Sequence, residues 1–306
     1  MSAGKTLRNA LMLEAPLLLP GAADALTARI LQQAGFAAVY ASGAGLANSS
    51  YAWPDLGLLG MSEVVDHVGR ICQAVDVPVI ADADTGFGGA LNVARTVRAL
   101  EDAGAAGVQI EDQVSPKRCG HFAGVAVVDD EEMLRRVRAA LRSRQDPDTV
   151  VVGRTDAVAT LGLDAAIRRA RMLAEAGVDV VFVEAPTALQ ALARIPLEVP
   201  APTLVNVVEG GRTPQLPLAA YAEMGFAVVL YANTAMRLAA HAVRQGAMEL
   251  RRHGDSSGLT DRLLSWDDRQ QLVRRDEYEE FAARLETADT TSGPLGSADV
   301  QEARST

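Results

Sequence analysis

The sequence predicts an α/β fold, most simply a (β/α)8 TIM barrel, and a repeat along the chain is the first reason. An amphipathic, Ala-rich stretch ends at a glycine and is followed by a short apolar run, and the repeated segment begins at Ala34, Ala103, Ala176 and Met224. This pattern is typical of a helix that ends at a C′ glycine and leads into a buried strand. Strands that alternate with helices form a parallel sheet.

The number of apolar runs is the second reason. Further runs lie between the repeats, and together they give candidate strands near residues 17, 38, 79, 108, 151, 180, 204 and 229. Eight parallel strands with helices between them close most simply into a barrel. An open, doubly wound sheet is the alternative, and it requires a Gly-rich phosphate turn after its first strand. The segment Leu19–Asp24 is not such a turn.

Helical patterns continue after the last candidate strand. They cover Ala240–His253 and Leu272–Leu285, with a polar connector at Gly254–Thr260. We therefore predict one domain over residues 1–285, a barrel with additional C-terminal helices. From residue 286 to residue 306 the chain has few large apolar side chains, which predicts a disordered tail.

Composition excludes several classes of partner. The chain has 306 residues and a net charge of -10, and it lacks the basic patches that nucleic acids and anionic membranes require. No apolar run reaches the ~18 residues of a membrane span, and the first residues do not resemble a signal peptide. Two cysteines, Cys72 and Cys119, do not indicate a disulfide framework. We expect a cytoplasmic protein that acts on small molecules.

Polar residues follow nearly every candidate strand. A barrel presents its chemistry at the carboxyl ends of its strands, so these side chains should converge on one face. They are Tyr40, Ser42, Asp82, Asp84, Glu111, Arg154, Glu184, Asn206 and Asn233, with Asp55 in the loop after the second strand.

The acidic residues among them indicate a metal site. Asp82 and Asp84 are two residues apart, so on a strand their side chains point the same way and repel unless a cation lies between them. A pair of capping residues is the plain alternative. With Glu111 from the next strand, the set favours Mg²⁺, which proteins bind through carboxylates and water. Zinc is disfavoured because no group of His and Cys residues has ligand spacing.

Cys119 lies in a polar segment between Lys117, Arg118 and His121. A free cysteine is often inert and buried, but three cationic neighbours favour a reactive thiolate. We expect the loop from Ser115 to Val125 to be mobile without ligand. Cys72, on an apolar helical face, is expected in the core.

Arg154 follows a Val-rich strand, and buried arginines are usually paired. Its partner is either a carboxylate of the barrel, such as Glu184 or Asp82, or a carboxylate of a substrate. The second interpretation is favoured because the guanidinium fork matches a carboxylate.

Seven motifs together resemble the isocitrate lyase/phosphoenolpyruvate mutase superfamily over Leu7–Leu285, with its short-chain, 2-methylisocitrate lyase-like lyases the most similar branch. The Lys-Arg-Cys-Gly-His loop is the most specific of the seven. The motifs are Ser42-Gly43-Ala44-Gly45, Pro54-Asp55-Leu56-Gly57, the segment Asp82–Gly88, Glu111-Asp112-Gln113, Lys117-Arg118-Cys119-Gly120-His121, Arg154-Thr155-Asp156-Ala157 and the segment Asn206–Gly211.

The resemblance implies a Mg²⁺-dependent C–C lyase, with Mn²⁺ able to replace Mg²⁺. It would cleave a 2-hydroxy di- or tricarboxylate, such as 2-methylisocitrate or an alkylmalate, to a 2-oxo acid and a carboxylate. Asp82, Asp84 and Glu111 would hold the metal, and Cys119 would donate a proton to the carbanion. A homotetramer with a C-terminal helix exchanged between subunits is also implied. The implied catalytic residues are Cys119, Arg154, His121 and Glu111, and the implied substrate-binding residues are Tyr40, Ser42, Gly43, Ala44, Asp55, Gly120, Arg154, Glu184, Asn206 and Asn233.

Three departures from the lyase pattern leave the substrate open. Gln109 stands two residues before Glu111, where many relatives have His. Tyr231-Ala232-Asn233-Thr234 replaces a Tyr-Pro pair, and Val208-Glu209-Gly210-Gly211 resembles carboxyphosphonoenolpyruvate mutases. Phosphonomutase-like and oxaloacetate hydrolase activities are therefore the alternatives. A catalytically silent binding barrel is a further alternative, and the intact set of acids, Cys119 and Arg154 argues against it.

Overall fold

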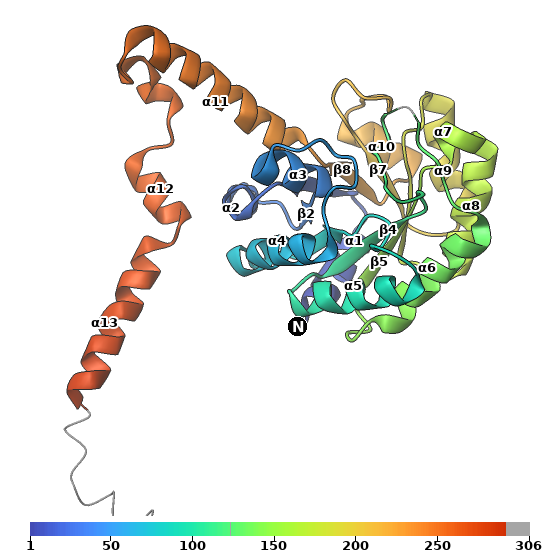
Figure 1. The fold of residues 1–306 in the computed structure, drawn as a ribbon, viewed down its shortest axis with the longest axis horizontal. Coiled ribbons are helices and arrows are strands. Elements are labelled where there is room, and N and C mark those ends of the chain that lie inside the picture. Colours follow the sequence, from blue (N-terminus) through green and yellow to red (C-terminus); the bar gives the residue numbers. More distant parts are fainter. Residues whose placement is uncertain (123, 292–306) are drawn as a thin grey trace, which may run out of the picture. The chain divides into compact units, whose positions relative to one another are not determined.

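The computed structural model describes residues 1–122 and 124–291. Within this part of the chain, eight parallel strands close into one barrel in the order β1 to β8, and β8 pairs with β1 (Figure 1). The predicted barrel is confirmed, and the open sheet is wrong because the first and last strands are hydrogen-bonded. The strands are β1 Leu17–Ala22, β2 Val39–Ala41, β3 Val79–Asp82, β4 Gly107–Glu111, β5 Val150–Thr155, β6 Val180–Val183, β7 Thr203–Asn206 and β8 Val228–Tyr231.

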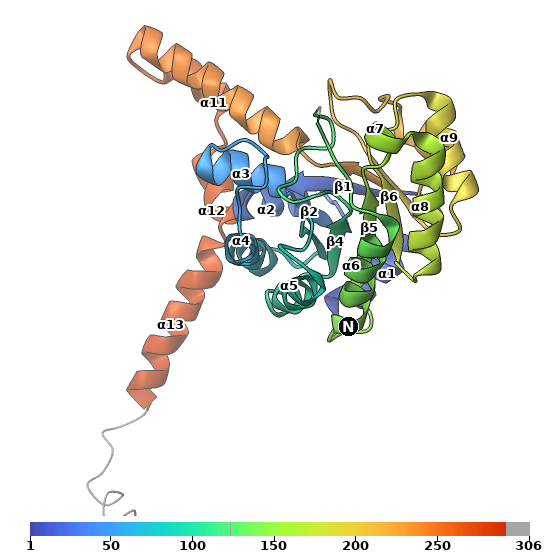
Figure 2. The ribbon, with the colours of Figure 1, turned by 45° about the vertical axis from the view of Figure 1, so that its right-hand side comes forward.

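Helices surround the barrel, as the view in Figure 2 shows for α5, α6, α8 and α9. In the described residues of the first unit they are α1 Ala3–Leu11, α2 Ala25–Gln33, α3 Gly43–Tyr51, α4 Met61–Ala74, α5 Ala90–Asp102, α6 Asp130–Ser143, α7 Val158–Leu161, α8 Leu163–Glu175, α9 Leu189–Glu198, α10 Leu218–Met224 and the first part of α11 Thr234–His253. The repeat glycines end these helices as predicted; Gly104 and Gly177, for example, have φ of 102° and 93°. Glycine reaches this left-handed region without a steric penalty.

Side-chain alternation decides which residues reach the barrel interior. One cluster of buried side chains, which includes Ile80 and Phe182, fills the interior, and a second cluster joins the strands to the surrounding helices. Because alternate side chains of a strand point the same way, the residues two positions later also face the interior. Those residues are Asp82 and Glu184, at the carboxyl ends of β3 and β6. The strand pattern thus delivers polar groups to one end of the barrel.

The chain divides into two compact units, Met1–Ala247 and a second that starts at Met248. The described part of the second contains the end of α11, a 3-10 helix at Ser257–Arg262, α12 Trp266–Leu272 and α13 Arg275–Thr291. The helix predicted over Leu272–Leu285 is present as α13 but begins at Arg275, because Arg274 adopts a left-handed φ of 53° between α12 and α13. The first residues of the predicted tail, up to residue 291, belong to α13, and the disordered tail stays a prediction.

The rest of the predicted tail, residues 292–306, lies outside the described residues. One domain over residues 1–285 stays a prediction. None of the described helices is both long enough and apolar enough to span a membrane.

Leu7 of α1 generates a prediction about stability. Its side chain is fully buried and belongs to the interior cluster, so α1 closes the amino end of the barrel. Replacing Leu7 with Ala should lower the free energy of unfolding by about 2–5 kcal/mol, because a cavity remains in the core. Leu13, which is 68% exposed, offers the matched Leu13→Ala control, with an expected change within about 0.5 kcal/mol. Urea unfolding measures both, and equal effects would show that α1 does not seal the barrel.

Candidate active site

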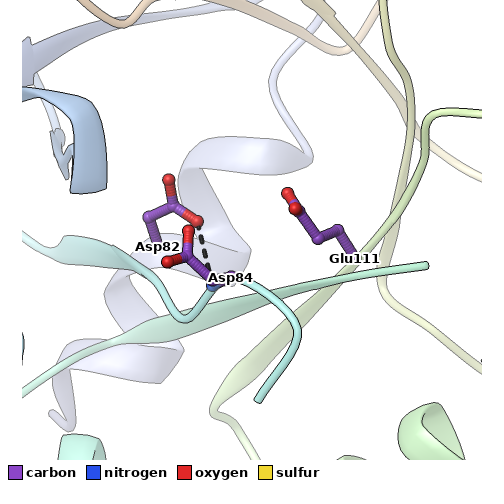
Figure 3. A group of neighbouring side chains, drawn as sticks. All are labelled: Asp82, Asp84 and Glu111. Carbon is purple, nitrogen blue, oxygen red and sulfur yellow. Dashed lines mark hydrogen bonds between the residues drawn. The ribbon is translucent and has the colours of Figure 1, made fainter. Parts of the chain in front are cut away.

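Three buried carboxylates meet at the carboxyl ends of β3 and β4. Asp82, Asp84 and Glu111 each offer an oxygen, and these oxygens lie within 4.8 Å of one another (Figure 3). Asp82 is held in place by the backbone N–H groups of Asp84, at 3.2 Å, and Gly43, at 3.4 Å. Asp84 itself has a left-handed φ of 47°, which turns its side chain back toward Asp82.

The electrostatics of this acidic triad favour a bound cation. Burial raises the pKa of Asp84 to about 6, although the Lys117 ammonium opposes the shift. Burial also raises the pKa of Glu111, with Arg154 opposing it. The Oε1 atom of Glu111 is buried without a hydrogen-bond partner. An all-oxygen set of carboxylates with unsatisfied acceptor capacity fits a hard divalent cation.

Lys117 has a different role from the one that its sequence position indicated. Its Nζ lies 2.6 Å from Asp55 Oδ1 and 2.8 Å from Asp84 Oδ1. Burial alone would lower the pKa of Lys117, but Asp84 and Asp55 outweigh burial and raise it, so the ammonium stays charged. The positive charge of Lys117 therefore compensates the acidic triad and does not stabilise a thiolate at Cys119. This contact could not be predicted from the sequence, because it depends on the path of the loop.

Arg154 is paired with carboxylates of the barrel. Asp156 binds it through two hydrogen bonds of 2.9 Å, and Glu111 and Glu184 each lie 3.3 Å away. The guanidinium also stacks over the ring of Phe182, 5.0 Å from its centroid. Pairing with Glu184, the less favoured of the two interpretations of Arg154, is present in the structure, and the substrate clamp stays a prediction. Asp156 was missed as a partner although it stands only two residues after Arg154.

Glu184 joins Arg154 to two further predicted site residues. His121 Nε2 lies 3.2 Å from Glu184 Oε1, and the Asn206 amide donates a 3.3 Å hydrogen bond to Oε2. Burial raises the pKa of Glu184, but Arg154 and His121 outweigh it and lower the pKa to about 2. The backbone N–H of Arg212 donates to His121 Nδ1 at 3.1 Å. His121 thus connects the Cys119 loop to the loop that follows β7.

The Cys119 segment covers a small polar cavity of about 40 Å³. Burial raises the pKa of the Cys119 thiol, so the predicted thiolate is wrong in this arrangement, in which Lys117 points elsewhere. Asp84, Glu111 and Gly43 lie outside the cavity lining; the other predicted site residues line it. They are Tyr40, Ser42, Ala44, Asp55, Asp82, Cys119, Gly120, His121, Arg154, Glu184, Asn206 and Asn233.

A larger outer cavity of about 550 Å³ adjoins the small one. Cys119, His121, Val208 and Asn233 line both cavities, so the thiol lies where the two meet. The outer cavity contains two arginines, Arg212 and Arg237. Arg237 is already occupied, because its Nη1 donates to the Glu209 carbonyl at 2.7 Å and lies 3.2 Å from the Glu209 carboxylate.

Gly120 allows the segment Lys117–His121 to pack closely against Arg154 and Asp156. A Cβ at this position would lie 2.5 Å from Asp156 Oδ1 and 2.8 Å from Arg154 Nη2. Gly120→Ala should therefore keep the segment from seating, and Cys119 should react with iodoacetamide about tenfold faster, since overpacking costs about 1–3 kcal/mol. A Cβ on Gly89 would meet nothing within 4 Å, so Gly89→Ala is the control. If Gly120→Ala reacts at the wild-type rate, the close packing is not what protects the thiol.

The comparisons with known proteins agree with this geometry. The family model described as phosphoenolpyruvate phosphomutase matches residues 7–251. The chain is 40% identical to 2,3-dimethylmalate lyase of Eubacterium barkeri, over 89% of this chain and 94% of that protein. It is 41% identical to 2-methylisocitrate lyase of Shewanella oneidensis, over 93% of this chain and 97% of that protein. A crystal structure of 2,3-dimethylmalate lyase superposes with a TM-score of 0.88 and 35% identity, covering 96% of this chain and 99% of the other. The chain belongs to the PEP mutase/isocitrate lyase superfamily of enzymes.

Proposed function

We propose that the protein is a Mg²⁺-dependent C–C lyase that cleaves a 2-hydroxy dicarboxylate or tricarboxylate into a 2-oxo acid and a second carboxylate. Mn²⁺ would replace Mg²⁺. The observation that carries the proposal is the placement of Cys119 in the lining of one cavity together with Asp82 of the acidic triad and with Arg154. Relatives act on 2,3-dimethylmalate and 2-methylisocitrate, as their names say, and these compounds are the first candidates.

The proposed reaction matches what these residues can do. Cleavage breaks the bond between the hydroxyl-bearing carbon and its neighbour. The hydroxyl would give its proton to a basic side chain of the site and become a carbonyl, and the electron pair would remain on the neighbour, where Cys119 supplies a proton. A cation held by Asp82, Asp84 and Glu111 would stabilise negative charge on the oxygens of the 2-oxo acid. Cys119, whose thiol has a raised pKa, is protonated and can donate to the carbanion. Closure of the segment around Cys119 over bound substrate would keep water from the reactive carbon.

The neighbouring residues would orient the substrate. Arg154, already fixed by Asp156, presents a guanidinium edge to the cavity, where a substrate carboxylate would bind. Ser42 caps α3 through a 3.1 Å bond from the Gly45 N–H, and its hydroxyl lies 3.4 Å from the Asn233 amide oxygen. In the outer cavity Glu209 holds Arg237, and Arg212 lines the same cavity, so both a dicarboxylate with an alkyl group and a tricarboxylate are candidate substrates.

Phosphonomutase-like and oxaloacetate hydrolase chemistry remain the alternatives within the superfamily. A mutase would move a phosphoryl group between carbon and oxygen and would not need Cys119 as a carbon acid. Asn233 in the cavity lining is the feature that favours this branch. A homotetramer also stays a proposal, supported by exposed Leu238 and Val243 on α11. Light scattering tests the assembly.

The first test is turnover with a substrate panel. Purified protein with Mg²⁺ should release a 2-oxo acid from 2,3-dimethylmalate or 2-methylisocitrate faster than from oxaloacetate or phosphonopyruvate. EDTA should abolish turnover, because removal of the cation leaves Lys117 and Arg154, among the described side chains, to compensate the negative charge of the acidic triad. Addition of Mg²⁺ or Mn²⁺ should restore turnover. Full activity after exhaustive chelation would contradict the metal requirement, and turnover of phosphonopyruvate alone would favour the mutase branch.

The second test separates the two branches with paired cysteine variants. Cys119→Ser should lower kcat by about 10²–10⁴, because a hydroxyl is a far weaker acid than a thiol of similar size. The KM should change little. Cys72→Ser is the matched control, since burial raises the pKa of Cys72 to about 12 and its side chain packs against the core far from the cavity lining. If Cys119→Ser keeps wild-type turnover, the phosphonomutase-like activity becomes the favoured hypothesis.

A further inference from the structure

Gln113 is the second residue after β4, and its backbone is fixed on two sides. It pairs with Val127 in an isolated antiparallel bridge, and the next residue, Val114, donates to the Ala126 carbonyl at 2.8 Å. Arg136 of α6 donates to the Gln113 carbonyl at 2.9 Å. The backbone at the base of the Cys119 loop is therefore anchored to the barrel independently of the residues at the cavity.

The side chain of Gln113 points back under the loop, where it is 1% exposed. Its Oε1 accepts from the Arg118 N–H at 2.9 Å, and its Nε2 donates to the Arg118 carbonyl at 2.8 Å. The same Nε2 donates its other hydrogen to Asp156 Oδ1 at 3.1 Å. One amide thus binds both backbone groups of the residue before Cys119 and a carboxylate of the site.

Asp156 Oδ1 is also the atom that accepts a 2.9 Å hydrogen bond from Arg154 Nη2. The other oxygen, Oδ2, accepts from Arg154 Nε at 2.9 Å, and the Asp156 N–H donates to Asp112. Asp156 therefore has a fixed position and joins Gln113 to the arginine. A continuous set of hydrogen bonds runs from the backbone beside Cys119 to the guanidinium that would bind the substrate.

We propose that Gln113 is a positioning residue that fixes the Cys119 thiol relative to Arg154. The catalytic importance of this positioning rests on the proposed function, in which Cys119 delivers a proton to a substrate held by Arg154. Lys117, on the other side of Arg118, ties the same segment to the acidic triad through Asp84. The two residues before Cys119 thus link the thiol to Arg154 on one side and to the acidic triad on the other.

Only an amide of this length satisfies the three contacts. Glutamate has the same shape but no N–H, so its carboxylate would face the Asp156 carboxylate and the Arg118 carbonyl. Methionine has a similar volume and makes none of the three bonds. Gln113→Met therefore removes the link with little change in packing, and Gln113→Glu replaces attraction with repulsion.

The experiment measures alkylation of the two cysteines in ligand-free protein, with iodoacetamide and mass spectrometry of the labelled peptides. Cys119 should react about tenfold faster in Gln113→Met, as the loss of two or three hydrogen bonds predicts, and faster still in Gln113→Glu. Cys72 reports general loosening in the same sample and should keep its wild-type rate. Gln145→Met is the matched control, because Gln145 lies between α6 and β5, at the other end of the barrel.

Turnover gives a second readout on the best substrate. Gln113→Met should lower kcat about tenfold while KM changes less than about threefold, because the thiol is misplaced and binding is retained. Wild-type labelling of Cys119 in both Gln113 variants would overturn the proposal. So would an equal rise at Cys119 and Cys72, which shows general unfolding. Labelling needs no substrate, so it judges the positioning of Cys119 even if the wild-type protein cleaves none of the candidate compounds.

Discussion

The balance of buried charge at the carboxyl end of the barrel is the constraint on which the site depends. Carboxylates from β3, β4, β5 and β6 converge there, and the described side chains that oppose them most directly are Lys117 and Arg154. An unpaired buried charge is costly, so every buried carboxylate oxygen needs a hydrogen-bond donor or a cation, or the carboxylate must be protonated. The raised pKa values of Asp84 and Glu111 mark where this balance is incomplete. A divalent cation would complete it and would be the group that a 2-hydroxy acid binds.

The fold was predictable because it rests on periodicity. Each candidate strand was found from its apolar run, and the alternation of side chains carried Asp82 and Glu184 to the interior without any knowledge of the loops. The acidic triad and most of the cavity lining followed from the same rule. The contacts of Lys117 and Gln113 did not, since they depend on how the segment after β4 turns back over the barrel. Sequence neighbours of Cys119 therefore suggested a thiolate, whereas the folded loop turns Lys117 away and buries the thiol.

The two cavities differ in size and in lining. The inner cavity, which Asp82, Cys119 and Arg154 line, is nearly filled by its own side chains. The outer cavity is larger, and there Glu209 holds Arg237 while Thr234 donates to the Glu209 carboxylate. Under the proposed function, the loops after β7 and β8 would contact the outer part of a substrate, whereas the ends of β3 to β6 supply the acidic triad and Arg154.

The backbone at Asp84 restricts its side chain in a second way. A φ of 47° is reached at low cost by Gly, Asn and Asp, and at a higher cost by residues with longer or branched side chains. Asn would keep the backbone but lose the charge that faces Lys117, Gly would lose the ligand, and Glu would keep the charge on an unfavourable backbone. Local conformation and local charge, which are separate physical demands, thus select the same amino acid, and this position has almost no room for evolutionary drift.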